Sequence, residues 1–485
     1  MSIATELNAL RTNLNSAYAA ISTAGGTVPS HKNSLNLATA IATIPQGYPN
    51  SLAYLAYDDV SRAQNYVNIC NPTPLGSASH AFAASAVSAA LTSLNLSRLT
   101  NFSNVVDTIC MFENNTALSS LTFPSTMNLS KVASMSGMFR NCQALTSLNL
   151  NWTTSSDLLT LYNMFVGCSG LTSITFGSNW NTSGVQSFYG LFNSCSALAN
   201  LTGFSNLSMA SMTDMRAMFY NCANLTSIDF SSQTINPDFY VASSTANYAL
   251  YGLTRCTSMN LTGLKSSGAD LSNTHIFGNN PALTTLTFGG AHRIAAENTT
   301  YKLADALLNL IEVKSGNTIT TLNMPNCTFF STDGSETTAI GSVADIWGGS
   351  ALTTANLSGW DVTAVDMTDN TADKMFTHSD NLTTLDLSGW TNPDGLNFGT
   401  MIGSDFIAAN TYRSCAPNLT TLILNTPSVV AVNAGGSGMA SSVNAFAGTP
   451  IAAGNGHIKV PSSLLSQYQA HSFWGRFSDS LEAIA

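Results

Sequence analysis

Cysteine is the residue type in this chain whose spacing suggests chemistry. Five cysteines recur at one place in a repeated phrase, each three residues before the first apolar residue of LTSLNL or a variant of it: Cys142, Cys168, Cys195, Cys222 and Cys256. Such a series could form disulfides or bind a metal ion. However, Asn115 stands at this place one repeat earlier, and the nine cysteines of the chain are an odd number. A single-file column also supplies one ligand per repeat, whereas a metal needs several around one point.

We therefore predict that the cysteines of this column are reduced and buried. A thiol is small and readily buried, and an asparagine at the same place could hydrogen-bond to the turn. The column is thus expected to be an internal ladder. No metal site and no cofactor is predicted.

The other chemistry-bearing side chains form no catalytic pattern. The seven histidines are scattered, and the chain has no HExxH, G-x-S-x-G, P-loop or nucleotide-binding glycine motif, so we expect no enzyme. A polysaccharide hydrolase would need paired carboxylates facing one cleft, which the repeat gives no reason to expect. The densest acidic cluster could hold calcium, but it lacks a fixed loop pattern and a solvated turn is favoured. Its members are Asp361, Asp366, Asp369, Asp373 and Asp380.

Two tryptophans occupy the same phase of neighbouring repeats. Trp360 lies in LSGWD and Trp390 in LSGWT. On the flank of a solenoid, in-phase aromatic rings could stack on the sugar rings of a cell-surface glycan. The alternative, which we favour, is that they pack between adjacent coils.

A repeat of 26 or 27 residues positions most of the cysteines. The phrase MFRNCQALTSLNL and its variants place their first leucines at intervals of 27, 26, 27 and 27, at Leu118, Leu145, Leu171, Leu198 and Leu225. In LTSLNL, Leu145, Leu148 and Leu150 should point inward from a short strand, while Ser147 and Asn149 face solvent. The pattern predicts a leucine-rich-repeat-like, right-handed β-solenoid with a parallel sheet, in which each coil buries its apolar face on its neighbours.

Beyond Leu225 the repeat is interrupted by insertions. Later phrases begin at Leu283, Ile319, Leu352, Leu382 and Leu419, with gaps of 36, 33, 30 and 37. One insertion, YKLADALLNLIEV at 301–313, has apolar residues at helical spacing and predicts a short helix packed on the coil. About twelve coils are expected, and the solenoid is placed at 91–455.

The two ends of the chain differ from the repeats. Residues 1–24 predict a helix with a heptad seam, so 1–47 is expected to be a helical attachment and oligomerisation module. The seam consists of Ile3, Leu7, Leu10, Leu14 and Ile21. Residues 48–90 carry no clear repeat and are expected to cap the first coil. Residues 456–485 predict a terminal cap built as strand, helix beginning at Pro461 and Ser462, and closing strand.

The composition is that of an exposed surface protein. Only 9% of the residues are charged, and Ser, Thr and Asn are abundant. With 16 Lys and Arg, no basic cluster and a net charge of −10, no nucleic-acid partner is expected. No membrane span is expected, and the first residues do not match a secretory signal.

The phrase MFxxCxxLTSLxL resembles the BspA-like leucine-rich repeats of bacterial surface proteins and of proteins encoded by gut phages, over roughly residues 85–485. The ending IKVPSSLLSQYQ...FWGRFSDSLEAI is similar to the closing cap of that family, with Lys459 in place of the usual aromatic residue. The opening 45 or so residues resemble a module at the N-terminus of phage structural and tail-associated proteins. Together these resemblances imply a virion component attached through its first residues, with the solenoid projecting outward.

Two functions follow as expectations. The first is a bacteriophage virion structural protein, a fibre, spike or decoration on head or tail, which contacts other virion proteins through its N-terminus and presents its solenoid to a host-surface glycan or protein. Its implied location is the particle surface, and the three-fold habit of phage fibres favours a homotrimer over a dimer. The alternative is a bacterial cell-surface BspA-like adhesin.

Overall fold

The computed structural model divides the chain into two compact units, Met1–Thr213 (unit 1) and Asp214–Ala485 (unit 2). Each is described separately. The residues that the structure describes are 15, 77–84, 91–97, 102–241, 243–267, 278–288, 291–294, 318–331, 351–360, 362, 376, 379–392, 395–402, 404–408, 411–433 and 441–484.

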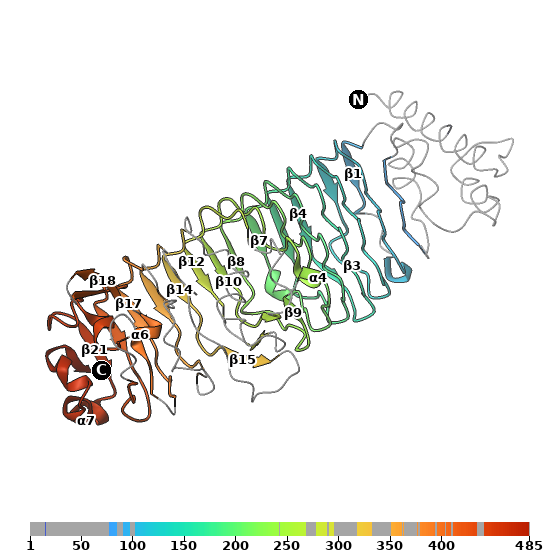
Figure 1. Ribbon diagram of the computed structural model, residues 1–485. Helices are drawn as coiled ribbons and strands as arrows, with labels where there is room; N and C mark the ends of the chain where they lie inside the picture. Colours follow the sequence, from blue (N-terminus) through green and yellow to red (C-terminus); the bar gives the residue numbers. More distant parts are fainter. Residues whose placement is uncertain are drawn as a thin grey trace. The chain divides into compact units, whose positions relative to one another are not determined.

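Unit 1 is a repeat solenoid whose short parallel strands come from successive coils (Figure 1). One two-stranded sheet joins β1 (Ser93–Asn95) to β2 (Ser120–Thr122), and a three-stranded sheet follows with β4 (Ser147–Leu150), β6 (Ser173–Phe176) and β7 (Asn200–Thr202). A further pair is β3 (Met127–Asn128) and β5 (Trp152–Thr153), and the 3-10 turns η2 (Phe102–Asn104) and η3 (Phe204–Asn206) complete the described elements of this unit.

The strand register in unit 1 places equivalent residues of the repeat side by side. Leu148 is opposite Ile174, which is opposite Leu201. In β4, Leu148 and Leu150 are buried whereas Ser147 and Asn149 are exposed. The inward and outward positions predicted from LTSLNL are therefore confirmed.

Aromatic rings stack along the inside of unit 1. The rings of Phe82, Phe112, Phe139, Phe165 and Phe192 lie nearly parallel, with successive centroids 5.6, 5.3, 5.4 and 5.7 Å apart. From Phe112 onward these are the phenylalanines of the Met-Phe or, at Phe192, Leu-Phe pair that opens each repeat. Each ring covers the face of the next, so a coil contributes its apolar surface to two neighbours at once.

Unit 2 is also a solenoid of parallel strands. Its nine-stranded sheet contains β8 (Ser227–Asp229), β10 (Ser258–Asn260), β12 (Thr285–Thr287), β14 (Thr321–Asn323), β16 (Thr354–Asn356), β17 (Thr384–Asp386), β20 (Thr421–Ile423), β21 (His457–Val460) and β22 (Leu481–Ala483). A four-stranded parallel sheet contains β9 (Tyr240–Val241), β11 (Lys265–Ser267), β13 (Ala291–Ile294) and β15 (Thr328–Ser331), and β18 (Ser404–Ala408) pairs antiparallel with β19 (Thr411–Ser414).

Helices are few and short among the described residues of unit 2. They are α4 (Ser243–Ala246), α6 (Phe398–Met401), α7 (Leu465–Ala470) and the 3-10 turns η6 (Asn444–Phe446), η7 (Ser462–Leu464) and η8 (Trp474–Ser480). The insertion at 301–313, for which the sequence predicts a helix, lies outside the described residues, as do residues 1–14 and 16–76.

The C-terminal cap has the predicted order of elements. Strand β21 is followed by η7, α7 and η8, and the closing strand β22 pairs parallel with β21. Two aromatic residues of the cap are buried and tied to the preceding coil. Trp474 donates its Nε1 hydrogen to the carbonyl of Val430 at 2.8 Å, and the Tyr468 hydroxyl accepts from the Val430 amide at 3.1 Å. The cap thus covers the last coil with satisfied polar groups.

The described part of the segment 48–90 differs from its interpretation as a cap without repeat. The amides of Ala78, His80, Phe82 and Ala84 donate to carbonyls of the next coil, between Asp107 and Glu113. This is the same ladder that later coils form with one another. The coil that contains residues 78–84 is not recognisable from the sequence, because Ala81 and Phe82 stand in place of Met-Phe and no cysteine follows them.

Replacing Ile174 by alanine should destabilise unit 1 by about 2–5 kcal/mol, because the buried side chain packs between two strands and leaves a cavity. The change is measured as the shift in free energy from chemical denaturation. Asn149→Ala, on the exposed side of the neighbouring strand, is the control and should change it by no more than about 0.5 kcal/mol. Equal effects of the two substitutions would contradict the assigned faces.

Candidate functional site

The repeated backbone of unit 1 places one residue of each coil in the left-handed region at the same point. The ladder of amide-to-carbonyl bonds aligns them in the order His80, Cys110, Gly137, Asn163 and Gly190, with φ between 54 and 61° except for Cys110 at 52°. Glycine and asparagine adopt this conformation readily, whereas other side chains are strained in it. At this left-handed position the first two described coils of unit 1 therefore have a histidine and a cysteine, whereas the next three have glycine or asparagine.

Glycine at the third position leaves room for the thiol. A Cβ atom on Gly137 would approach the Sγ atom of Cys110 to 3.0 Å. The side chain of Cys110 thus lies over the backbone of the next coil, beside the turn that carries Glu113.

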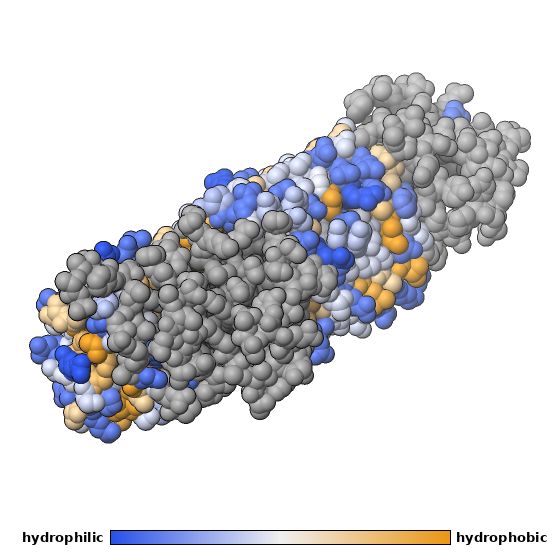
Figure 2. Space-filling view, in the orientation of Figure 1, coloured by the Kyte–Doolittle hydropathy of each residue, from blue (hydrophilic) through white to orange (hydrophobic). Residues whose placement is uncertain are grey.

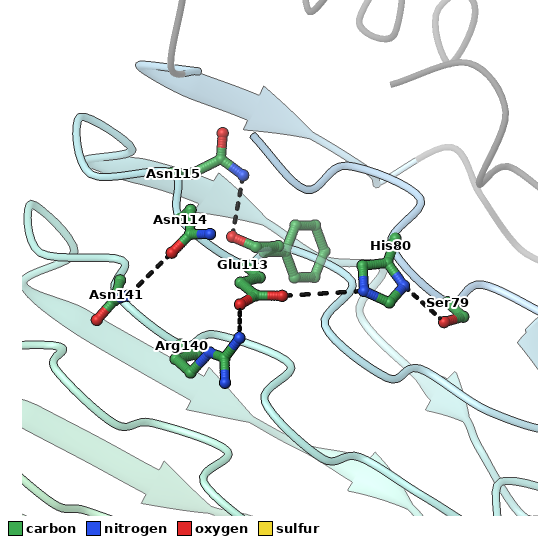
Figure 3. Close-up of polar contacts among 8 residues, drawn as sticks. Ser79, His80, Glu113, Asn114, Asn115, Arg140 and Asn141 are labelled. Atoms are coloured by element: carbon green, nitrogen blue, oxygen red, sulfur yellow. Dashed lines mark hydrogen bonds and ion pairs between the residues drawn. The ribbon is translucent and has the colours of Figure 1, made fainter. Parts of the chain in front are cut away.

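The carboxylate of Glu113 is the centre of this polar cluster (Figure 3). Its side chain is 8% exposed. Arg140, from the next coil, donates from Nη2 to Glu113 Oε1, and His80, from the preceding coil, places Nε2 3.9 Å from Oε2. His80 Nδ1 is in turn 2.9 Å from Ser79 Oγ. One buried carboxylate therefore joins side chains of three successive coils.

Cys110 is not poised as a nucleophile. Burial, followed by the hydrogen bond to Glu113 and the negative charge of that carboxylate, raises the pKa of the Cys110 thiol to about 12, although Arg140 acts in the opposite direction. The thiol is protonated at neutral pH, whereas nucleophilic catalysis requires the thiolate. The cluster therefore does not have the electrostatics of a cysteine-histidine catalytic pair.

The column of cysteines is an internal ladder of hydrogen bonds, as predicted. Cys142, Cys168 and Cys195 each donate from Sγ to a phenylalanine carbonyl of the preceding coil, at 3.1, 3.0 and 3.1 Å. Asn115 makes the equivalent contact, from Nδ2 to the Phe82 carbonyl at 2.6 Å. Cys142, Cys168, Cys195 and Cys222 are buried, reduced cysteines, and burial raises the pKa of Cys168 to about 12. Reduced, buried thiols are therefore confirmed.

The placement of Cys256 in this column is wrong: Met259 pairs with Ile228, so Cys256 occupies the place of Leu225, and its Sγ donates to the carbonyl of Ser258 at 3.2 Å. Its thiol is also buried and reduced.

The glycan contact suggested by the sequence for Trp360 and Trp390 needs correction. Their side chains are 1% and 0% exposed and stack on one another with centroids 5.6 Å apart. Their Nε1 atoms donate to the carbonyls of Met324 and Leu357 in preceding coils. A sugar has no access to these ring faces, and the tryptophans pack between coils because a buried indole needs both apolar neighbours and a hydrogen-bond acceptor.

The remaining predicted site residues are largely outside the described residues. This applies to the attachment seam of Ile3, Leu7, Leu10, Leu14 and Ile21, and to Asp361, Asp366, Asp369 and Asp373 of the acidic cluster. Asp380 is described, and its Oδ1 accepts from Arg413 Nη2 at 2.6 Å.

Sequence reasoning missed the cluster around Glu113. His80, Cys110 and Glu113 belong to two coils, and the first coil lacks the recognisable phrase. The alignment of left-handed positions, in which Cys110 and Gly137 are 27 residues apart and His80 lies 30 residues before Cys110, relates the three residues, but it is visible only in the structure.

Comparison with known proteins identifies a related family for part of the chain. A model described as "Mycoplasma protein of unknown function, DUF285" matches residues 77–197 and 106–233. No curated protein matches the chain. A crystal structure of a leucine-rich repeat protein from Bacteroides ovatus is similar at 13% identity, covering 81% of this chain and 84% of that one, with a TM-score of 0.24. So low a TM-score does not establish a shared fold, and the solenoid assignment depends on the strand register described above.

The family match begins at residue 77, which agrees with the first described coil. Among the described residues, no helix is both long and apolar enough to cross a membrane.

Alkylation of the native protein should show that Glu113 suppresses the reactivity of Cys110. At pH 8 roughly one Cys110 in 10,000 is a thiolate if its pKa is about 12, and the rate should rise with pH as that fraction grows. Glu113→Gln removes the negative charge that helps raise this pKa and should speed the reaction. Peptide-resolved mass spectrometry measures the rate, and Cys142 should stay unmodified in both proteins as proof that the fold is intact. An unchanged or slower rate in the variant would contradict this electrostatic account.

Proposed function

We propose that this protein is a non-enzymatic solenoid that presents a hydroxyl- and amide-rich sheet face to an external partner, and that it does so as a bacteriophage virion component. The observation that carries the proposal is the composition of the outward strand positions. In unit 1 these are Ser147, Asn149, Ser173, Thr175, Asn200 and Thr202, all uncharged. Such a face offers many donors and acceptors and little electrostatic attraction, which suits a neutral glycan or a polar protein surface.

Hydroxyl and amide side chains also predominate on the outward face of the larger sheet of unit 2, although Asp229, Asp386, Lys459 and Glu482 add charges there. Within the nine-stranded sheet, each strand from β8 to β20 begins with Ser or Thr. A column of threonines just before these strands bonds across coils, with hydroxyls of Thr284, Thr353 and Thr420 donating to carbonyls of the preceding coil at 3.1, 2.9 and 3.0 Å. These hydroxyls fix the surface while keeping an oxygen acceptor available. On the face drawn in Figure 2, hydrophilic and hydrophobic residues are interspersed over the described surface.

Attachment is assigned to residues 1–47. The apolar seam of the predicted helix would be exposed to water if the helix stood alone, and an isolated helix of this length is marginal. We therefore place other virion proteins or copies of the chain, a trimer in preference to a dimer, on that seam. The coils are taken as right-handed, because crossovers between parallel strands of one sheet are right-handed in nearly all proteins.

A bacterial cell-surface adhesin of BspA-like type is the second candidate. The repeat phrase supports it as well as it supports the virion protein, because both would present the same polar sheet. The two candidate functions differ in the structure to which the N-terminal residues attach: the phage particle for the virion protein and the cell surface for the adhesin.

Immunogold electron microscopy of phage particles and of the bacterium that produces them tests the proposal. Labelling of intact virions is expected for the full chain, and a chain beginning at Tyr48 should keep its unfolding midpoint but be absent from particles, because it lacks the seam. Labelling of the cell envelope without virions would favour the adhesin. Full incorporation of the truncated chain would contradict the role given to residues 1–47.

A further inference from the structure

We infer that His80, Cys110 and Glu113 form a binding site for one divalent metal ion of the zinc class. Each supplies a different donor, and the three ligand atoms all lie within 4.8 Å of one another. In a tetrahedral zinc site the ligands are about 2.0–2.3 Å from the metal and hence roughly 3.3–3.8 Å apart. The separation of 3.9 Å between His80 Nε2 and Glu113 Oε2 is close to that value.

The two oxygens of Glu113 have separate roles in this arrangement. Arg140 donates to Oε1, while Oε2 faces the imidazole of His80. An ion can therefore bind at Oε2 without displacing the guanidinium. Arg140 becomes a positioning residue that orients the carboxylate, as hydrogen-bonding partners of metal ligands commonly do.

The imidazole is oriented by a similar contact. His80 Nδ1 lies 2.9 Å from Ser79 Oγ. When Nδ1 carries the proton that this hydroxyl accepts, Nε2 keeps its lone pair on the side of Glu113. Figure 3 shows the resulting chain from Ser79 through His80 and Glu113 to Arg140.

The backbone supports the site and leaves it open on one side. Cys110 and His80 occupy equivalent left-handed positions of adjacent coils, and the absence of a side chain on Gly137 accommodates the sulfur. The side chain of His80 is 44% exposed and that of Glu113 is 8% exposed. Solvent can thus reach the ion, and a water molecule can complete a three-residue ligand set.

The donor set selects the class of ion. Sulfur and imidazole nitrogen favour zinc and similar transition metals, whereas calcium and magnesium prefer oxygen ligands alone. Binding requires Cys110 to release its proton to solvent, so one proton leaves from the thiol for each ion bound and the affinity should rise with pH. The charged groups that face the thiol are Glu113, which favours the bound cation, and Arg140, which opposes it.

Titration of the full-length, reduced and metal-free protein with Co²⁺ tests the site, because a cobalt–thiolate bond gives a charge-transfer absorption band in the near ultraviolet. One equivalent of Co²⁺ should produce this band, and Zn²⁺ should remove it by competition. Cys110→Ser should abolish the band, and His80→Asn, which tolerates the left-handed conformation, should weaken binding at least about tenfold.

A matched control is the histidine–glutamate pair in the C-terminal cap. His457 Nδ1 lies 3.0 Å from Glu482 Oε2, and His457→Asn should leave both band and affinity unchanged. Unfolding midpoints of all variants, measured without metal, establish that they fold. Absence of a stoichiometric band in the wild-type protein, or its persistence in a folded Cys110→Ser variant, would overturn the proposal.

Discussion

The structure depends on the stacking of each coil on the next through backbone hydrogen bonds between equivalent positions of the repeat. In unit 1 the amides of Phe112, Phe139 and Phe165 donate to carbonyls one coil further along at 2.8, 2.9 and 3.0 Å. A coil on its own would expose its leucines and phenylalanines and leave these groups without partners. Stacking satisfies both requirements together, and it brings residues about one repeat apart in sequence into contact.

The same constraint explains which polar side chains are tolerated inside. Because most inner positions repeat from coil to coil, a buried donor can find its acceptor in a neighbouring coil, although the Nε1 atom of Trp152 is buried without a partner. The column of cysteines and Asn115 meets this condition with a carbonyl of the preceding coil. Tryptophans Trp180, Trp360 and Trp390 follow the same rule with their indole nitrogens. Buried polar side chains are thus compatible with a close-packed core, because the carbonyl groups that accept their hydrogen bonds recur in each repeat.

The sequence was sufficient to predict what depends on periodicity. Spacing and residue type predict the inward leucines of LTSLNL, the parallel sheet, the buried thiols and the C-terminal cap at 456–485. It was insufficient where the phrase degenerates, as at Ala81 and Phe82, because the coil there is recognised only from its hydrogen bonds. The cluster of His80, Cys110 and Glu113 was unpredictable for the same reason. For Trp360 and Trp390 the sequence favoured packing between coils but also allowed a glycan contact, because the residues of one coil do not reveal which of its side chains the neighbouring coil covers.

Disulfide trapping of the strand register tests the stacking most directly. Ser147 and Ser173 are partners in β4 and β6, and adjacent strands are about 4.8 Å apart, within the range that a disulfide spans. The double variant Ser147→Cys, Ser173→Cys should therefore form a cross-link that peptide mass spectrometry detects under mild oxidation. Ser147→Cys with Thr175→Cys is displaced by two residues, which separates the Cα atoms by roughly 8 Å, and should not. Cross-linking of the displaced pair in preference to the aligned pair would contradict the stacked-coil account.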